Sequence, residues 1–222
     1  MYELYQHYSG TMYLRLLTAL HSETLESHEV YRTLYDNEKS PSWIRPQEMF
    51  HEQVATGASR FTLTGRVGRA LPEDEAELAS FGFDAWGNGQ SVHEYVHASL
   101  ESRDHMRGTR WFLEGSDGSK QAVLNLLRFA RGTVGFASVA TSPKFRGKGL
   151  ASLLVRAVME LERIEQPHVR FLLFSEARPV IFERLGFKIL PDSDQHFRPS
   201  LAMATGELPI TERERGFLRD YF

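Results

Sequence analysis

The strongest local pattern in this chain is a strand, a glycine-containing turn and a helix in direct succession, which read VGFASVAT, SPKFRGKG and LASLLVRAVMELE from Val134 onward. The start of a helix carries unpaired backbone N–H groups and a partial positive charge. Gly147 and Gly149 allow close approach of the backbone to a ligand, and Arg146 and Lys148 add positive charge. The segment therefore predicts a cradle for a pyrophosphate group.

Two widespread phosphate-binding signatures do not fit this turn. The P-loop requires G-x-x-x-x-G-K-[ST], and the dinucleotide-binding fingerprint requires G-x-G-x-x-G. From Gly147 the sequence runs G-K-G-L-A-S, so the third glycine is absent, and Lys148 is not followed by Ser or Thr. Taken alone, the turn also fits an ordinary connection between a strand and a helix.

The turn and its surroundings resemble the GNAT superfamily of acyl-CoA-dependent N-acyltransferases. The family signature [QR]-x-x-G-x-[GA] is matched by Arg146, Gly149 and Ala151. The stretch LLFSEARPVIFERLGFKIL resembles the closing strand, helix and Y-x-x-x-G-F motif of the family, and the order of elements agrees across about residues 62–205. The resemblance implies an α/β fold with a GNAT-type mixed sheet flanked by helices.

The same resemblance implies acetyl-CoA as co-substrate, with no metal. In the family, the strand before the turn pairs through its backbone with the pantetheine arm, and the turn holds the pyrophosphate. Carried over position by position, the implied cofactor-binding residues are Val139, Ala140, Thr141, Arg146, Gly147, Lys148, Gly149, Leu150, Ala151, Ser152 and Ser175. The plainer alternative is that these residues only form a strand and a helix start.

The expected reaction is acetyl transfer from a thioester to a primary amine, on a small molecule or a lysine-like side chain. This reaction requires a neutral amine, a polarised thioester carbonyl and often an acid that protonates the leaving thiolate. Many family members supply a Tyr before G-F, where this chain has Phe182. Because the chain has no cysteine, we expect direct attack in a ternary complex rather than a cysteine acyl-enzyme. Glu176 and Glu183 are weak candidates for a replacement acid. A glutamate at such a position more often belongs to a solvated surface or forms a salt bridge than acts as a catalytic acid.

Further candidates for acid or base are Asp84, His93 and His97, in segments that cover the acceptor site in the family. The sequence does not rank them. A noncatalytic acyl-CoA sensor is the alternative function, and the absence of the usual Tyr at Phe182 is its main support.

A second motif predicts a different chemistry. His93, Glu94 and His97 form H-E-x-x-H on an expected helix, the pattern in which two histidines bind zinc and the glutamate activates water. The extended motif needs a third histidine, but Arg103 stands at that position, and Glu114 is a distant substitute. A zinc metalloprotease is therefore a remote alternative to a surface helix carrying two histidines.

Residues 1–61 differ in composition from residues 62–222, and we therefore expect a domain boundary near residue 61. They hold five Lys or Arg against eight Asp or Glu, with runs such as TMYLRLLTAL and SHEVYRTLY that are typical of strands. Pro46 is expected to open one short helix in PQEMFHEQV. A small β-rich, barrel-like domain is the resulting expectation.

Residues 4–61 also resemble a small bacterial family known only as a domain of unknown function. The likeness runs through Tyr5, His7, Tyr8, Gly10, the H-S-E-T-L-E stretch from His21, Val30, Tyr31, Leu34, Tyr35, Trp43, Ile44, Arg45, Pro46, Met49, Phe50, Arg60 and Phe61. The aromatic residues beside Arg45 could form a surface for a ligand or a protein partner, although aromatic residues of so small a domain more often form its core.

The remaining chain predicts further elements. FTLTGRV is expected to be a strand, residues 91–101 a helix, and Asp117-Gly118 the turn of a hairpin. After the long helix we expect the strand VRFLLFS, a short helix ending at Gly186, and a strand over residues 187–190.

Composition excludes several classes of protein. The net charge of −3 gives no broad basic field for nucleic acid, and no run reaches the roughly 18 apolar residues that span a bilayer. The first ten residues lack the basic and apolar parts of a signal peptide. With no cysteine for disulfides, a cytoplasmic protein is the expectation.

Overall fold

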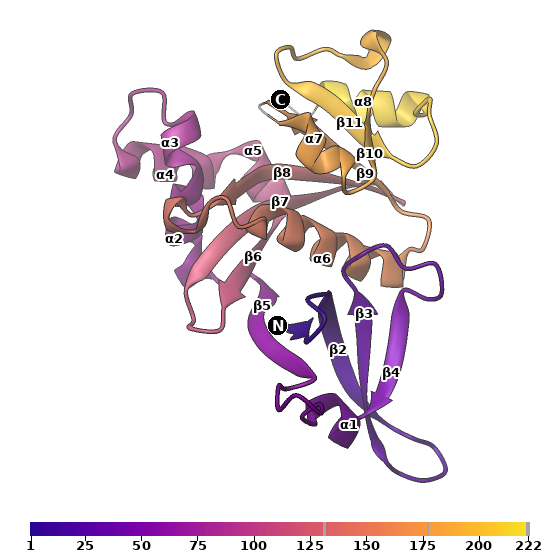
Figure 1. Ribbon diagram of the computed structural model, residues 1–222. Coiled ribbons are helices and arrows are strands. Elements are labelled where there is room, and N and C mark those ends of the chain that lie inside the picture. The colour runs from indigo at the N-terminus through magenta and orange to yellow at the C-terminus, as the bar shows by residue number, and fades with distance from the viewer. Residues whose placement is uncertain (131, 177, 221–222) are drawn as a thin grey trace. The chain divides into compact units, whose positions relative to one another are not determined.

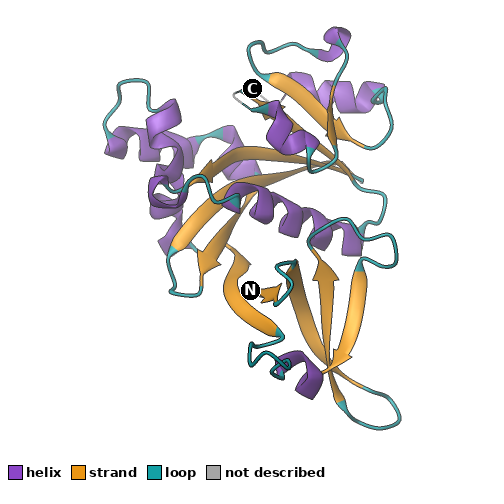
Figure 2. Cartoon of the chain, viewed as in Figure 1, coloured by secondary structure: helices purple, strands orange, loops and turns teal. Residues whose placement is uncertain are grey.

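The computed structural model describes residues 1–130, 132–176 and 178–220. The chain forms two compact units, each treated by itself below. The first unit comprises Met1–Gly68 and Leu113–Gln121, and the second comprises Arg69–Phe112 and Ala122–Phe222. Figure 1 labels the elements along the chain, and Figure 2 distinguishes helices from strands. Among the described residues, no helix is both long enough and apolar enough to cross a membrane.

The first unit is rich in strands, as the sequence predicts. Its strands follow the order β5-β1-β2-β3-β4, and each neighbouring pair is antiparallel. The elements are β1 (Tyr2–His7), β2 (Met12–Leu20), β3 (Ser27–Thr33), β4 (Ser42–Pro46), α1 (Gln47–His51) and β5 (Phe61–Arg69). Helix α1 begins directly after Pro46, but it is shorter than the predicted PQEMFHEQV segment.

An aromatic cluster forms the core of the first unit. Tyr5, Tyr31, Phe50 and Phe61 are buried, with Phe50 and Phe61 stacked at a ring-centroid distance of 4.1 Å. Trp43 packs against this cluster and is partly buried. Most of the aromatic pattern in the N-terminal sequence is therefore explained by core packing.

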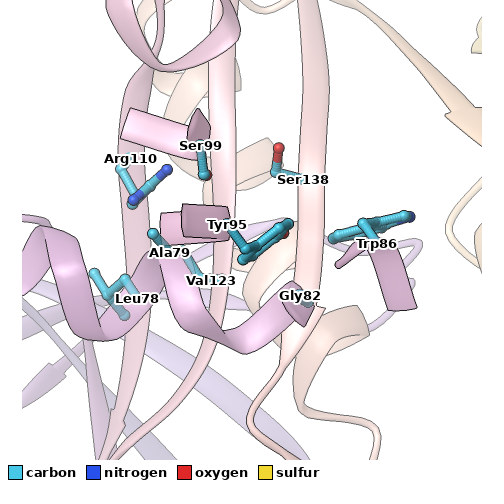
Figure 3. A pocket seen from close by; sticks show the side chains of 10 residues that line it. Leu78, Ala79, Gly82, Trp86, Tyr95, Ser99, Arg110, Val123 and Ser138 are labelled. Carbon is cyan, nitrogen blue, oxygen red and sulfur yellow. The ribbon is translucent and has the colours of Figure 1, made fainter. Parts of the chain in front are cut away.

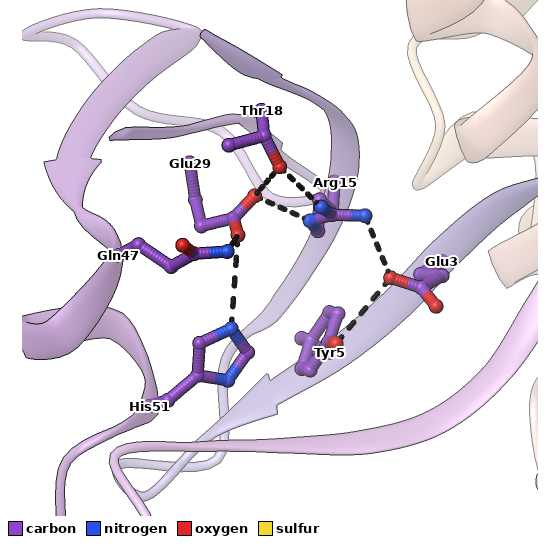
Figure 4. Close-up of polar contacts among 7 residues, drawn as sticks. All are labelled: Glu3, Tyr5, Arg15, Thr18, Glu29, Gln47 and His51. Atoms are coloured by element: carbon purple, nitrogen blue, oxygen red, sulfur yellow. Dashed lines mark hydrogen bonds and ion pairs between the residues drawn. The ribbon is translucent and has the colours of Figure 1, made fainter. Parts of the chain in front are cut away.

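Beside this core lies a buried carboxylate. The Glu29 side chain is fully buried and accepts hydrogen bonds from Arg15 Nε at 2.5 Å, Gln47 Nε2 at 2.9 Å and Thr18 Oγ1 at 3.1 Å. Arg15 also donates to Glu3 through Nη1 at 2.9 Å. Figure 4 shows these contacts, which satisfy a charge that would otherwise be costly to bury.

The second unit contains a mixed sheet. Its strands follow the order β10-β11-β9-β8-β7-β6, in which β8 and β9 are parallel while β7 and β8, β9 and β11, and β10 and β11 are antiparallel. The strands are β6 (Thr109–Gly115), β7 (Lys120–Ala130), β8 (Thr133–Thr141), β9 (Arg170–Ser175), β10 (Phe187–Ile189) and β11 (Leu201–Thr205). The tip of the hairpin between β6 and β7, which is counted with the first unit, turns at Gly118, where φ has the left-handed value of +79°.

Helices pack against this sheet, which confirms the expected mixed α/β class. The α-helices are α2 (Glu75–Ala79), α3 (Phe83–Trp86), α4 (Val92–Glu101), α5 (Arg103–Arg107), α6 (Leu150–Glu165), α7 (Pro179–Glu183) and α8 (Glu212–Asp220), and the 3₁₀ helices are η1 (Pro72–Asp74), η2 (Ser80–Gly82), η3 (Pro143–Phe145) and η4 (Asp192–Asp194). In α6 the residues Leu154, Ala157, Val158 and Leu161 are buried, which is the stripe expected of an amphipathic helix.

Strand β8 is irregular at its centre. One β7 residue, Leu124, faces both Ser138 and Val139, so β8 carries a bulge. Ser138 has a left-handed φ of +49°, an uncommon conformation for a residue other than glycine. The ladder between β8 and β9 ends at the pair Phe136 and Leu173. Beyond this pair, within the described residues, the edge of β8 that faces β9 is free of ladder hydrogen bonds.

Candidate acyl-CoA site

The turn after β8 owes its shape to two glycines. Gly147 and Gly149 have φ values of +79° and +74°, and a Cβ atom built at either position would meet nothing within 4 Å. The constraint is therefore conformational rather than steric, because other residues reach this left-handed region only at a cost. Gly149 is the N-cap of α6, and no side chain caps this helix start.

The turn presents unpaired backbone donors. Among the described residues, the N–H groups of Gly147, Lys148 and Gly149 have no acceptor. The first N–H groups of α6 also lack intrahelical partners, as at every helix start. These donors and the positive end of the helix dipole lie in one exposed segment, which suits an anion.

The arginine of the turn has a carboxylate partner. Arg146 binds Asp84 of α3 through both terminal nitrogens, with Nη2 2.7 Å from Oδ1, and its Nε donates to the carbonyl oxygen of Thr141 at 3.2 Å. The hydrogen bonds from Arg146 hold the pKa of Asp84 below its ordinary value, and those to Asp84 raise the pKa of Arg146. Lys148 instead lies over the ring of Phe145, at 5.5 Å from its centroid.

Of the other predicted cofactor residues, four lie on the separating strands β8 and β9, whereas residues 150–152 begin α6. Val139, Ala140 and Thr141 follow the bulge of β8, where the edge toward β9 has no ladder partner. Ser175 ends β9, is buried, and pairs with Leu201 of β11. An extended chain that needs backbone partners could therefore enter along the free edge of β8.

A small pocket adjoins the bulge of β8 (Figure 3). Its polar lining comes from Tyr95 and Ser99 of α4, Arg110 of β6, and Ser138. Gly82 lets Trp86 approach, because a Cβ at position 82 would fall 2.3 Å from the indole ring and 2.7 Å from the Tyr95 hydroxyl oxygen. The sequence analysis did not single out these lining residues as a site.

Family models identify both parts of the chain. Residues 110–189 match a model of the acetyltransferase (GNAT) domain, and residues 3–63 match a family described as protein of unknown function (DUF1653). The chain contains a GNAT acetyltransferase domain. A DUF1653 region precedes this domain, as the sequence resemblance predicts. A comparison with curated proteins found no match.

Solved structures resemble the GNAT part of the chain in fold. A protein from Lactobacillus plantarum that is assigned as an N-acetyltransferase has a TM-score of 0.52 at 15% identity, with 64% of this chain and 97% of that chain covered. A GNAT-family acetyltransferase from Staphylococcus aureus has a TM-score of 0.50 at 12% identity, covering 64% and 98%. A chimera of spermidine N-acetyltransferase SpeG from Vibrio cholerae with hSSAT also scores 0.50, at 14% identity, covering 64% and 95%.

The weak acid candidates of the GNAT domain lie in different surroundings. Glu176 follows β9 and accepts a hydrogen bond from the indole nitrogen of Trp86 at 3.0 Å. Glu183 is exposed on α7 and has no partner among the described residues. Phe182 is half-buried, with its ring edge-on to Phe187 at a centroid distance of 6.1 Å. Of these side chains, only the two glutamates could exchange a proton.

The H-E-x-x-H segment is the first half of α4 in the GNAT domain. Glu94 accepts hydrogen bonds from the backbone and hydroxyl of Ser91, at 2.8 and 2.7 Å, and so forms the capping box that starts the helix. His97 lies 3.3 Å from Glu101, one turn further along. Within the described residues, no group of three potential metal ligands comes together. Glu94 thus has a structural role that the motif did not predict.

Proposed function

We propose that the chain is an N-acetyltransferase that transfers the acetyl group of acetyl-CoA to a primary amine, by direct attack in a ternary complex. The observation that carries this proposal is the succession of a free β8 edge, a turn with unpaired backbone donors and an uncapped helix start. These features match the needs of pantetheine and pyrophosphate in turn. The GNAT family match supports the same ligand.

In this proposal the cofactor follows the chain from strand to helix. Val139 and Thr141 pair through their backbone with the amide groups of pantetheine, and Ala140 lies between them in the strand. The pyrophosphate binds the turn through the backbone of Gly147, Lys148 and Gly149. Arg146, Leu150, Ala151, Ser152 and Ser175 complete the proposed set of cofactor-binding residues.

In this proposal the protein accelerates acetyl transfer mainly by placing the thioester and the amine next to each other. A backbone N–H near Val139 polarises the thioester carbonyl, and the neutral amine attacks the carbonyl carbon. The new C–N bond forms as the C–S bond breaks, the nitrogen loses one proton to solvent, and the thiolate of CoA leaves. A thiol has a pKa near 8.5, so its thiolate is a tolerable leaving group without a dedicated acid.

Calorimetric titration with acetyl-CoA, followed by a CoA-release assay over a panel of amines, tests the proposal. We expect binding and turnover, and we expect Gly149→Glu to abolish binding because it adds bulk and negative charge to the turn. Binding without turnover would favour the acyl-CoA sensor, which the Phe182 substitution supports. Absence of binding would reject both functions.

We further propose that residues 1–61 form a domain that binds a ligand or protein partner, and that the acyltransferase domain occupies residues 62–222. Support comes from the separate match of residues 3–63 to its own family. Deleting residues 1–61 tests this role. Unchanged turnover on free amines, together with loss of a captured partner, is the expected result.

A further inference from the structure

Three basic side chains of the first unit gather at the ends of separate strands. His7 is the last residue of β1, Arg45 lies near the end of β4, and Arg60 directly precedes β5. The backbone N–H of Tyr8 donates to the carbonyl oxygen of Arg60 at 3.0 Å, which joins the ends of β1 and β5. Burial lowers the pKa of His7, and the positive charges of Arg60 and Arg45 lower it further, so both guanidinium groups lie near the imidazole. His7, Arg45 and Arg60 thus form a basic cluster.

Arg45 has the most open donors of this cluster. Its side chain is partly buried, its Nε donates to the hydroxyl oxygen of Tyr31 at 3.4 Å, and among the described residues neither terminal nitrogen has an acceptor. Its cross-strand neighbour in β3 is Glu29, but that carboxylate is bound by Arg15 and Gln47 instead. A guanidinium with both terminal nitrogens open presents two parallel N–H donors, the geometry that binds an oxyanion at two points.

The other two members of the basic cluster each add an open donor. The backbone N–H of Ser9 donates to Nδ1 of His7 at 3.3 Å, so this contact assigns the proton of the neutral ring to Nε2. Within the described ranges, Nε2 has no partner. Arg60 binds Glu52 through Nη2 and through Nε at 2.8 Å, whereas its Nη1 has no acceptor in the part of the chain that the structure describes. Three chain segments therefore offer donors near one another.

The number of open donors in the basic cluster selects the kind of anion. A carboxylate has two oxygens, and the terminal nitrogens of Arg45 alone can bind both of them. A phosphate monoester has three terminal oxygens and a charge of about −1.5 to −2 near pH 7, so it can use donors from all three residues. Recognition of phosphate by clustered arginines is a common mode of binding. The basic cluster therefore fits a phosphate group better than a carboxylate.

An exposed aromatic ring lies beside the basic cluster. Tyr8 is 57% exposed, and its ring centroid lies 4.2 Å from that of His7. A single exposed aromatic residue is ordinary on a protein surface, but this one adjoins open hydrogen-bond donors. A planar ring attached to a bound phosphate would have the face of Tyr8 to stack on.

We infer that the DUF1653 region binds a phosphate monoester that carries a planar ring. The phosphate binds both terminal nitrogens of Arg45, Nη1 of Arg60 and Nε2 of His7, and the ring stacks on Tyr8. The inference rests on the binding role proposed for residues 1–61 and names the class of ligand, and it does not depend on acetyl transfer.

Titration calorimetry of the full-length protein with matched probes tests the inference. AMP is compared with adenosine, and phenyl phosphate with phenol. We expect at least one phosphate monoester to bind at least about tenfold more tightly than its partner, because charge-assisted hydrogen bonds are lost with the phosphate. Tighter binding of AMP than of phenyl phosphate would assign the ligand to the nucleotides, and the reverse would assign it to the aryl phosphates. Equal affinities within both pairs, or no binding of either phosphate, would overturn the inference.

Variants locate the bound phosphate. Arg45→Gln is expected to weaken the binding of the tighter phosphate probe at least about tenfold, because the two-point contact is lost. Lys39→Gln, which removes an exposed lysine of the same unit, is the matched control for charge and should leave the affinity unchanged. The turn before α6 also suits an anion, so the comparison separates the two places. A folded Arg45→Gln protein that keeps the full affinity would contradict the assignment.

Arg45 also binds Tyr31, so its variant can fail to fold, and exposed Tyr8 offers a second variant. Tyr8→Ala is expected to weaken the binding of the tighter ring-bearing phosphate at least about threefold and to leave the affinity for ribose 5-phosphate, which has no planar ring, unchanged. Equal losses for both probes, or no loss for either, would overturn the inference. If no phosphate bound while deletion of residues 1–61 still abolished the capture of a partner, the inference would fail and the proposed binding role would stand.

Discussion

Arg146 in the turn before α6 and Asp84 in α3 form a two-point ion pair, with Nη2 and Oδ1 2.7 Å apart. Both side chains are about half exposed, at 45% and 48%. The arginine expected to meet a phosphate therefore already has an anionic partner, and that partner belongs to a helix near the pocket. Binding of a pyrophosphate must share Arg146 with Asp84 or displace it.

The Asp84→Asn variant tests this competition. We expect acetyl-CoA to bind about two- to fivefold more tightly, because the variant frees Arg146 and removes a negative charge near the phosphates, and exposed ion pairs are worth about 1 kcal/mol or less. Titration calorimetry at two salt concentrations measures the effect. Glu73→Gln, an exposed acid in η1, controls for net charge. Weaker binding by Asp84→Asn would instead mean that Asp84 positions Arg146 for the phosphate.

The left-handed glycines give a second prediction. Gly149→Ala is expected to lower the free energy of unfolding by about 1 kcal/mol, the cost of a side chain in this conformation. It should also weaken acetyl-CoA binding at least about tenfold, because relief of the strain reorients the N–H groups of the turn. Gly118→Ala is the matched control, since its φ is +79° and a Cβ there also meets nothing within 4 Å. An equal loss of affinity in both variants would contradict a specific role for the turn.

The sequence predicts the class of fold because its signals there are local. The glycines at 147 and 149, the apolar stripe of α6 and the hairpin turn at Gly118 each fix a few consecutive residues. Family resemblance then supplied the order of strands and helices. Strand β11 and helix α8 were not predicted, because β11 is short and the pattern of α8 is dominated by charge.

The candidate site is harder to predict from the sequence, because the residues that contact one another there are far apart along the chain. Nothing near Asp84 in the sequence indicates that it meets Arg146, and the left-handed bulge falls on Ser138 rather than on a glycine. The sequence around Arg110 does contain a clue that this residue is unusual, because Arg110 is a single charged residue at the start of the apolar run WFL. A charge buried in a strand needs a partner or a ligand, and that rule would have marked it. The roles of the cofactor-binding residues stay predictions.

The missing tyrosine gives a third prediction. Phe182 packs edge-on to Phe187 in the helix where GNAT proteins often have Tyr, so Phe182→Tyr adds a phenol without a change of ring shape. We expect kcat to rise about tenfold, because the phenol can protonate the leaving thiolate. The pH profile should gain a falling limb near pH 10, where a phenol ionises. Phe217→Tyr on α8 controls for an added hydroxyl, and an unchanged kcat in Phe182→Tyr would show that thiolate departure needs no acid there.

The buried Glu29 in the DUF1653 region predicts how its stability depends on pH. Burial acts to raise the pKa of Glu29, but hydrogen bonds from Arg15, Gln47 and Thr18 together lower it below the ordinary value of 4.5. A carboxyl whose pKa is lower in the folded state binds protons more readily when unfolded. Its stabilising contribution is therefore present above about pH 4.5 and is lost as the pH falls through the folded-state pKa.

Glu29→Gln should remove this dependence and lower the free energy of unfolding at pH 7 by about 3 kcal/mol, because it leaves the partly buried Arg15 without its main partner. Denaturant unfolding from pH 3 to pH 7, followed by tryptophan fluorescence, measures both effects. Glu38→Gln, which neutralises an exposed acid, is the control and should follow the unmodified protein. If Glu29→Gln kept the full loss of stability below pH 4.5, other carboxyl groups would be its source and Glu29 would not govern the acid response of this region.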